Sequence, residues 1–196
     1  MGIMAKQMMA LKESGLEEAA SEIYIGVNGD ESEAFDASEY APSKSKIIPH
    51  GRGSASELTT LHYIQKWLRP GWNVCYHHIK GATHPGSKIW EAWRNCMERV
   101  VIWNWRDCVR DLEHGFDTAG AHWMSSEKYA IIDPSQRYWG GNFWWATSEH
   151  LLKLPTIQAN ADNHNMFYEA EVWIGKSPGK IRTMDYARHF PMQGCA

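Results

Sequence analysis

The sequence predicts an α/β fold with a largely parallel sheet and helices on its faces, in a single domain that spans residues 1–196. Helical and extended patterns alternate along the chain, an order that is typical of parallel strands joined by helical crossovers. The chain has 196 residues, of which 43% are hydrophobic and 22% charged. It is therefore long enough to bury a core as one ordinary globular domain.

The first third of the chain predicts a helix, a strand and a long loop. Apolar residues recur with helical spacing in residues 3–14, and Gly15 ends this pattern. Isoleucine and valine occupy every second position in SEIYIGVNGD, which predicts a strand closed by a turn at Asn-Gly-Asp. Residues 29–53 are polar and contain several Pro and Gly residues, so we expect a loop that a short strand at 46–48 interrupts.

The middle of the chain predicts a second helix, a central strand and a third helix. Ser54 and Glu57 match a capping box for a helix that ends near Leu68, before Pro-Gly. The segment WNVCYHHIKG predicts a strand over residues 73–79. Helical spacing of apolar residues continues through residues 88–113, with a break expected near its middle, at the tryptophan of VVIWN.

The last third predicts shorter elements. The segment GFDTAGAHW indicates a strand or a loop, and Asp133-Pro134 turns the chain before YWGGNFWWA. Ser148 is expected to cap a short helix that Pro155 ends, and FYEAEVWIG is expected to run from a strand into a helix.

Composition disfavours several classes of function. The formal net charge of −3, without a dense basic stripe, disfavours nucleic acid as a partner. The cysteines Cys75, Cys96, Cys108 and Cys195 lack zinc-type spacing, which favours free buried thiols in a reducing, cytoplasmic setting. The amino-terminal segment lacks the apolar run of a signal peptide, and no transmembrane segment is expected, because no run approaches the ~20 apolar residues of a membrane span.

The segment CYHHIKGATHPG carries the first group of candidate functional residues. Adjacent residues of a strand point to opposite faces, so His77 and His78 cannot simply share one metal ion with His84, although a metal site stays an alternative. Ligands of open α/β sheets bind at the carboxyl ends of the strands, where we expect His78, Lys80 and Gly81. Lys80 is either a partner for a phosphate group or a solvated surface charge.

The segment YWGGNFWWATSEHLLKLP carries the second group. The chain contains 11 tryptophans, and amphipathic aromatic side chains often line binding clefts. The two glycines would let a ligand or another backbone approach, and Asn142 offers donors and an acceptor. Trp144 and Trp145 alternate sides, so one could pack inward while the other faces a cleft. A buried, bulged strand explains the same residues equally well.

Glu169 and Glu171 form the third group, in YEAEVWIG. They would share one face if the segment were extended, and a carboxylate there could act as a general base toward a hydroxyl group. The alternative is a solvated acidic pair at the start of a helix, where the helix dipole favours glutamate.

Seven segments in this order resemble a family of small GT-A-like glycosyltransferases, from about Gln7 to Gly175. They are LKESGL, IYIGVNG, ELTTLHYIQKWL, VCYHHIKG, GFDTAG, GGNFWWATSEHLLKLP and YEAEVWIG. GNFWWA with the following Leu-Pro is the most specific of them, and YHHIKG is the next. The resemblance implies a Rossmann-like sheet, a nucleotide-sugar donor, and a carbohydrate or another hydroxyl compound as acceptor.

The resemblance also assigns residues to the donor site. Its YHHIKG residues would occupy the place where many such enzymes carry an Asp-x-Asp metal motif, which this chain lacks: they are Tyr76, His78, Lys80 and Gly81. In the simpler alternative Lys80 neutralises the diphosphate directly. In the other, a divalent metal is held by groups such as Asp117 or His189.

By the same resemblance, Asn142, Trp144 and Trp145 would border the donor sugar and the acceptor. Glu169 or Glu171 would be the base of an inverting enzyme, and the sequence does not choose between them. The family's first strand, which helps to hold the nucleotide base, has no counterpart before the first predicted helix. Either the chain begins after this strand or the sheet lacks it.

Two other functions are consistent with the sequence. A carbohydrate- or nucleotide-binding protein without turnover would use the tryptophans but would not need Glu169 or Glu171. A metal-dependent hydrolase would use histidines, among which the candidates are His78, His84, His122 and His189. Glycosyl transfer accounts for the cation at a strand end, the amide, the aromatic residues and the carboxylate together.

Overall fold

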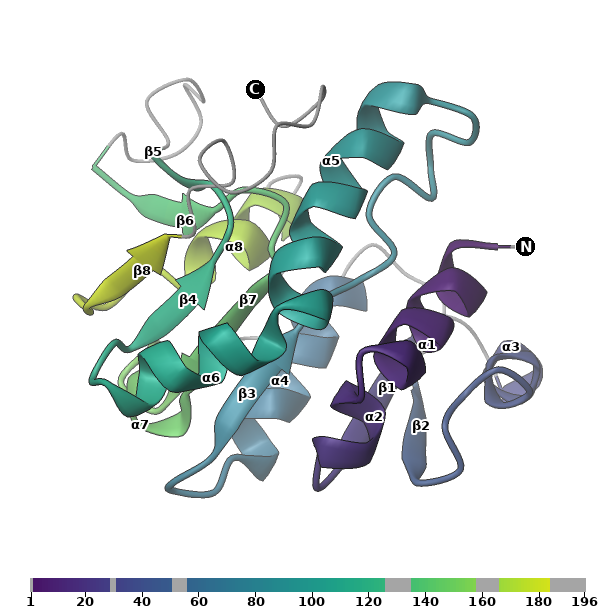
Figure 1. Cartoon of the computed structure of the whole chain (residues 1–196), viewed down its shortest axis with the longest axis horizontal. Coiled ribbons are helices and arrows are strands. Elements are labelled where there is room, and N and C mark those ends of the chain that lie inside the picture. The colour runs from purple at the N-terminus through teal and green to yellow at the C-terminus, as the bar shows by residue number, and fades with distance from the viewer. Residues whose placement is uncertain (1, 29–30, 51–55, 126–134, 158–165, 184–196) are drawn as a thin grey trace. The chain divides into compact units, whose positions relative to one another are not determined.

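The computed structural model describes residues 2–28, 31–50, 56–125, 135–157 and 166–183, which form a mixed α/β fold (Figure 1). The chain divides into two compact units. The first contains residues 1–67 and 156–170, and the second contains residues 68–155 and 171–196. The α/β class predicted from the sequence is confirmed, whereas the single domain over residues 1–196 stays a prediction.

The first unit contains a pair of parallel strands with helices before, between and after them. Its elements are α1 (Ile3–Glu13), α2 (Leu16–Ala19), β1 (Ile23–Val27), α3 (Glu31–Ser38), β2 (Ser45–Pro49) and α4 (Ser56–Trp67). Strands β1 and β2 pair in register from Ile23↔Ser45 to Val27↔Pro49. The predicted helix over 3–14 and both predicted strands are confirmed, and Gly15 adopts the expected left-handed conformation, with φ 75°.

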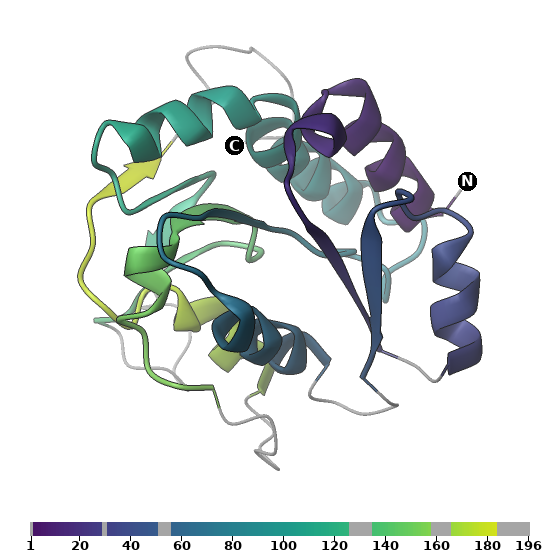
Figure 2. The same cartoon turned by 90° about the horizontal axis from the view of Figure 1, so that it is seen from below.

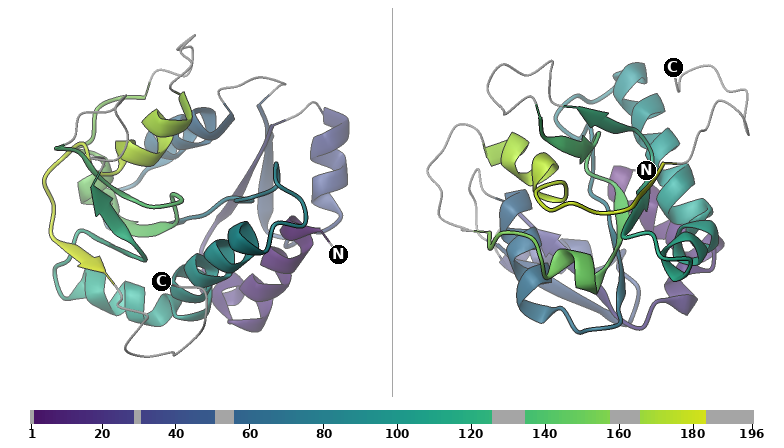
Figure 3. Two further views of the ribbon diagram at one scale, coloured as in Figure 1. Left: turned by 90° about the horizontal axis from the view of Figure 1, so that it is seen from above. Right: turned by 90° about the vertical axis from the view of Figure 1, so that its left-hand side faces the viewer.

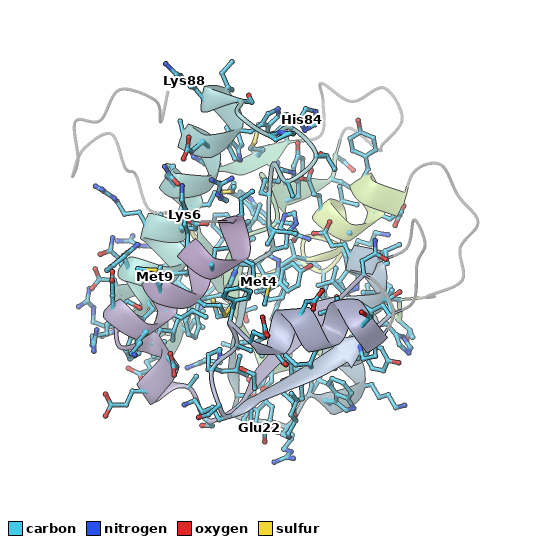
Figure 4. All side chains as sticks on the ribbon, turned by 90° about the vertical axis from the view of Figure 1, so that its right-hand side faces the viewer. Met4, Lys6, Met9, Glu22, His84 and Lys88 are labelled. Atoms are coloured by element: carbon cyan, nitrogen blue, oxygen red, sulfur yellow. The ribbon has the colours of Figure 1, made fainter. Side chains whose placement is uncertain are left out.

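Two details of the first unit differ from the prediction or extend it. Helix α3 lies in the segment for which the polar composition predicted a loop. A stacked ring pair joins α4 to β1, because the ring centroids of Trp67 and Tyr24 lie 4.8 Å apart. Within α4, Trp67 also stacks on Tyr63, with 4.9 Å between the ring centroids. Figure 4 labels Met4, Lys6 and Met9 on α1, whose buried residues are Gln7, Ala10 and Leu11.

The second unit contains most of the remaining elements. They are β3 (Asn73–Tyr76), α5 (Lys88–Glu98), the π-helix η1 (Arg99–Trp103), α6 (Trp105–Glu113), β4 (Thr118–Gly120), β5 (Trp123–Ser125), β6 (Arg137–Trp139), β7 (Trp144–Thr147), α7 (Ser148–Leu151) and β8 (Ile181–Thr183). Helix α8 (Met166–Trp173) begins in the first unit and ends in the second. The predicted break in the 88–113 helix is confirmed by η1, where the backbone widens before α6 begins.

The sheet of the second unit is mixed, so the prediction of a largely parallel sheet is wrong. The strand order is β3-β7-β4-β8; β7 runs antiparallel to β3 and to β4, and only β4 and β8 pair in parallel. Strands β5 and β6 form a separate antiparallel pair. The period-2 hydrophobic pattern identifies a strand but carries no information about its direction, and this explains the error.

Helices cover both faces of this four-stranded sheet. Figures 2 and 3 show α5 and α6 on one side of the sheet and the end of α8, residues 171–173, on the other. Trp145 faces η1, where its indole N–H donates to the carbonyl of Val101 at 2.8 Å. Trp144 points to the opposite face, and its ring lies 6.4 Å from that of Trp173 on α8. The two adjacent tryptophans therefore fill two different layers of the core.

The cysteines of the described residues are free thiols, as predicted: Cys75, Cys96 and Cys108. Burial raises the pKa of both Cys75 and Cys108, so these two thiols are poor nucleophiles. Cys195 lies outside the described residues. Among the helices of the described chain, none combines the length and apolar character needed to cross a membrane.

Candidate functional site at the carboxyl ends of β3 and β4

The candidate site lies at one edge of the four-stranded sheet. Because β3 and β4 both run antiparallel to β7, they are parallel to each other, and their carboxyl ends meet at the edge where β7 begins. The register shows this directly, since Trp144 pairs with Tyr76 on one side and with Gly120 on the other. The strand predicted over residues 73–79 is shorter in the structure, because β3 ends at Tyr76, and His78, Lys80 and Gly81 follow its carboxyl end. Such an edge is where open α/β sheets bind their ligands.

Lys80 and Glu171 form an ion pair beside this edge. Lys80 Nζ lies 2.8 Å from Glu171 Oε1, and the two side chains are 21% and 15% exposed. The sequence indicated both residues as candidates but did not predict that they pair, because 91 positions separate them. The pair is partly desolvated, so each charge is stabilised by its partner to a greater extent than it would be in a fully exposed pair.

The main chain around Lys80 is a tight turn held against α5. The Lys80 N–H donates to the carbonyl of His78 at 2.9 Å. Gly81 adopts φ +82°, and a Cβ there would lie 3.0 Å from the Cβ of Trp90. Lys80 Nζ also lies 5.8 Å from the centroid of the Trp90 ring, within reach of a cation–π interaction. Two features therefore favour glycine at position 81 of this turn: the left-handed backbone, and the close approach of the Trp90 side chain.

Arg94 on α5 is a site residue that sequence reasoning missed. Its side chain is buried, with 5% exposure, and Nη1 donates to the carbonyl of Lys80 at 3.0 Å. Arg94 Nε lies 3.4 Å from Glu98 Oε1, one helical turn later. A signal was present in the sequence, because Arg94 lies three residues before the core residue Met97 and so shares the apolar face of its helix. A charge on such a face needs buried partners.

His78 joins the strand end to the glycine turn before β7. Its Nε2 lies 2.9 Å from the carbonyl oxygen of Gly141, so Nε2 carries the proton and donates. The rings of His77 and His78 lie 5.9 Å and 5.4 Å from that of Phe143. Burial, and secondarily the charge of His78, lower the pKa of His77 to about 4, and its buried Nδ1 has no hydrogen-bond partner among the residues that the structure describes.

The aromatic segment is part of the core and does not form the wall of a cleft. Trp144 is 0% and Trp145 5% exposed, so the expectation that one of them faces a cleft is wrong. Asn142 is fully buried with φ 57°, and its Oδ1 accepts a 2.7 Å hydrogen bond from Trp144 Nε1. A Cβ on Gly141 would collide with Met97 and would lie 2.8 Å from Trp93 Nε1. Packing against α5 therefore explains the glycine at position 141, in agreement with the alternative that this segment is a buried, bulged strand.

Asp117 does not join the candidate site. It precedes β4 and therefore lies at the amino end of that strand, at the other edge of the sheet from Gly120. Its Oδ2 accepts a 2.7 Å hydrogen bond from the backbone N–H of Lys180. This hydrogen bond closes the turn before β8, so Asp117 has a structural role. The alternative in which a divalent metal is held by a group such as Asp117 or His189 stays a prediction, and a metal bound to Asp117 would lie at the edge of the sheet opposite Gly120.

Glu169 and Glu171 lie on helix α8, as in the helical alternative, so the extended segment that would place them on one face is not formed. Two residues of an α-helix are about 200° apart around its axis. Glu171 points to Lys80, whereas Glu169 is exposed on another side of α8. The structure thus brings one of the two candidate bases to the strand end.

The other histidines are scattered. His84 bonds to Thr83 and lies 5.2 Å from the ring of Trp90, and Figure 4 shows it with Lys88 near the amino end of α5. His122 lies 3.5 Å from Cys96 Sγ. His189 is outside the described residues. Within the described ranges, no group of three or more His, Cys, Asp or Glu residues is arranged to hold a metal ion.

Together, His78, Lys80, Arg94, Gly141 and Glu171 form what we call the strand-end cluster. It supplies a flexible cation that could bind a phosphate group and, in contact with it, a carboxylate that could accept a proton. No family model matches the chain, and no curated protein or solved structure is detectably similar to it.

Proposed function

We propose that the protein is a glycosyltransferase that moves a sugar from a nucleotide-sugar donor to a hydroxyl acceptor. The observation that carries the proposal is the 2.8 Å contact between Lys80 and Glu171 at the carboxyl ends of β3 and β4. Glycosyl transfer needs a cation for the departing diphosphate and a base for the acceptor hydroxyl, and this pair provides both. The motif resemblance of the sequence points to the same reaction.

The arrangement of the second unit supports a finer proposal about the fold. A sheet with helices on both faces and a ligand edge at the carboxyl ends of its parallel strands is the architecture of nucleotide-binding α/β domains. We propose that the second unit is a variant of the GT-A-like, Rossmann-like fold in which β7 enters antiparallel. The free cysteines of the described residues favour the cytoplasm as its location.

In the proposed reaction the acceptor oxygen attacks the anomeric carbon of the donor sugar. The bond from this carbon to the phosphate oxygen breaks, and the nucleoside diphosphate leaves with the electron pair. Lys80 stabilises the charge that develops on the leaving group. Glu171 takes the proton of the acceptor hydroxyl.

A divalent metal is not needed for these roles of Lys80 and Glu171. The strand-end cluster contains one carboxylate, Glu171, and Asp117, the carboxylate named as a possible metal ligand, precedes β4 at the opposite edge of the sheet. At phosphate sites Mg²⁺ is usually held by one or two carboxylates together with the substrate phosphates. We propose instead that Lys80 alone neutralises the diphosphate, and we therefore expect donor binding to persist in EDTA.

A thermal-shift screen tests the proposal. The purified chain is heated with common nucleotide sugars and with ADP, GDP, UDP and TDP, in Mn²⁺ and in EDTA. A ligand at 100 times its dissociation constant stabilises the folded state by about 2.7 kcal/mol, which is easily detected. We expect stabilisation by one nucleotide and its sugar, with no loss in EDTA.

Two variants make the screen specific to the strand-end cluster. Lys80→Ala should abolish the stabilisation, whereas Lys88→Ala, which removes the same charge from an exposed position on α5, should preserve it. A response that survives Lys80→Ala contradicts the assignment of Lys80. Binding without any consumption of the nucleotide sugar would instead indicate a binding protein without turnover.

A further inference from the structure

The Lys80–Glu171 ion pair presents a conflict within the proposed site. A carboxylate 2.8 Å from Lys80 Nζ neutralises the cation and would repel an incoming diphosphate. The same contact occupies Glu171, which must be free to accept a proton from the acceptor. Both proposed roles therefore require the pair to separate.

We propose that the diphosphate displaces Glu171 from Lys80, so that binding of the donor also exposes the base. This inference rests on the proposed function and describes how the same site is regulated. Before the donor binds, Lys80 and Glu171 satisfy each other. After it binds, Lys80 pairs with the diphosphate, and Glu171 is left as a poorly solvated carboxylate in need of a new hydrogen-bond donor. The acceptor hydroxyl supplies that donor.

The main chains of both partners are fixed, so the exchange is a movement of side chains. The carbonyl of Lys80 accepts from Arg94 at 3.0 Å, and its N–H donates to His78 at 2.9 Å. The end of α8 is anchored by Trp173 Nε1, which donates to the carbonyl of Pro155 at 2.9 Å, and by a 3.0 Å contact of His150 Nε2 with the carbonyl of Ile174. These contacts allow the two side chains to change partners without a change in either backbone.

Lys80 is suited to such a movement. Its ammonium group is carried on a flexible four-carbon stem, unlike the planar fork of an arginine. The Trp90 ring, with its centroid 5.8 Å from Nζ, offers a second favourable environment on the side of α5. The cation therefore keeps a stabilising neighbour while it leaves Glu171. Arg94 holds the turn in place throughout.

The exchange makes an unusual prediction about affinity. Removal of the proposed base should strengthen binding of the leaving group, because Glu171 competes with the diphosphate for Lys80. We expect Glu171→Gln to bind the nucleoside diphosphate identified by the thermal screen at least about fivefold more tightly, which corresponds to about 1 kcal/mol. Glu171→Asp, which keeps the charge but shortens the side chain, should fall between the wild type and Glu171→Gln.

Isothermal titration of the full chain with ADP, GDP, UDP and TDP, and with inorganic pyrophosphate, tests the inference. Glu169→Gln is the matched control, because it removes the same charge from another side of α8; its affinity should equal that of the wild type. Tighter binding by Glu171→Gln alone supports the exchange. Equal or weaker binding by Glu171→Gln overturns the exchange and leaves the proposed function intact. If neither the wild type nor Glu171→Gln binds any of these probes, the exchange and the proposed function both fail.

Discussion

Asn142 offers a direct test of how the turn before β7 is held, because two separate features of this residue can be removed one at a time. Its backbone is left-handed, with φ 57°, and its fully buried side chain accepts a 2.7 Å hydrogen bond from Trp144 Nε1. Asn142→Gly keeps a residue that tolerates this backbone but deletes the hydrogen bond. Asn142→Ala deletes the hydrogen bond and also replaces asparagine, which tolerates the left-handed region, with a residue that tolerates it poorly.

The magnitudes follow from these two terms. A buried indole N–H without an acceptor costs about 1–3 kcal/mol, so Asn142→Gly should lower the free energy of unfolding by that amount. The left-handed backbone costs alanine a further ~1–2 kcal/mol. Asn142→Ala should therefore lower the free energy of unfolding by roughly 2–5 kcal/mol in all. For a chain of this size, each kcal/mol lowers the melting temperature by about 2–4 °C.

Urea denaturation followed by tryptophan fluorescence measures these differences, since the chain contains 11 tryptophans. The order of stability should be wild type, then Asn142→Gly, then Asn142→Ala. An Asn142→Ala protein as stable as Asn142→Gly would refute the backbone part of the reasoning. A glycine variant within about 0.5 kcal/mol of the wild type, the usual range of a neutral surface substitution, would refute the hydrogen-bond part.

Three further predictions concern neighbouring positions. Gly141→Ala should lower the free energy of unfolding by roughly 2–4 kcal/mol in the same urea assay, since φ is +82° and the new Cβ would collide with Met97; an unchanged midpoint would contradict this. The pKa of His77 is about 4 in the folded chain and near 6.5 when unfolded, so the unfolded state binds more protons between these values, and stability should fall by up to about 3 kcal/mol as the pH drops from 6.5 to 4. His77→Phe should remove this part of the pH dependence, and an identical slope would argue against it. Arg94→Lys should weaken nucleoside diphosphate binding about tenfold by loosening the turn at Lys80, through loss of a charged hydrogen bond; unchanged affinity in titration would exclude a positioning role.

Local sequence signals predicted the elements well where the signal is itself local. The helix ended by Gly15, the alternating strand β1 and the break that becomes η1 all depend on residues within one or two turns of each other. The location of Lys80 at a strand end also follows from the neighbouring sequence alone. These features needed no knowledge of tertiary contacts.

The features that the sequence did not predict depend on distant partners. The direction of β7 is set by pairing with two strands, and hydrophobic alternation does not encode it. YEAEVWIG was expected to begin as a strand, but α8 buries its apolar residues as a helix, and this selects Glu171 over Glu169. The Lys80–Glu171 contact joins residues 91 positions apart, so only the folded chain reveals it. The tryptophans suggested a cleft because burial cannot be read from residue type.

The release of nucleoside diphosphate tests the central claim most directly. The chain is incubated with the nucleotide sugar that stabilises it, with a panel of carbohydrate acceptors, and release is compared among the wild type, Glu171→Gln and Glu169→Gln. A general base contributes about 10²–10⁴-fold to a rate. We expect release by the wild type, a loss of at least about 100-fold in Glu171→Gln, and a rate within a few-fold of the wild type in Glu169→Gln. Full turnover by Glu171→Gln, or no release by the wild type from any nucleotide sugar, would contradict it.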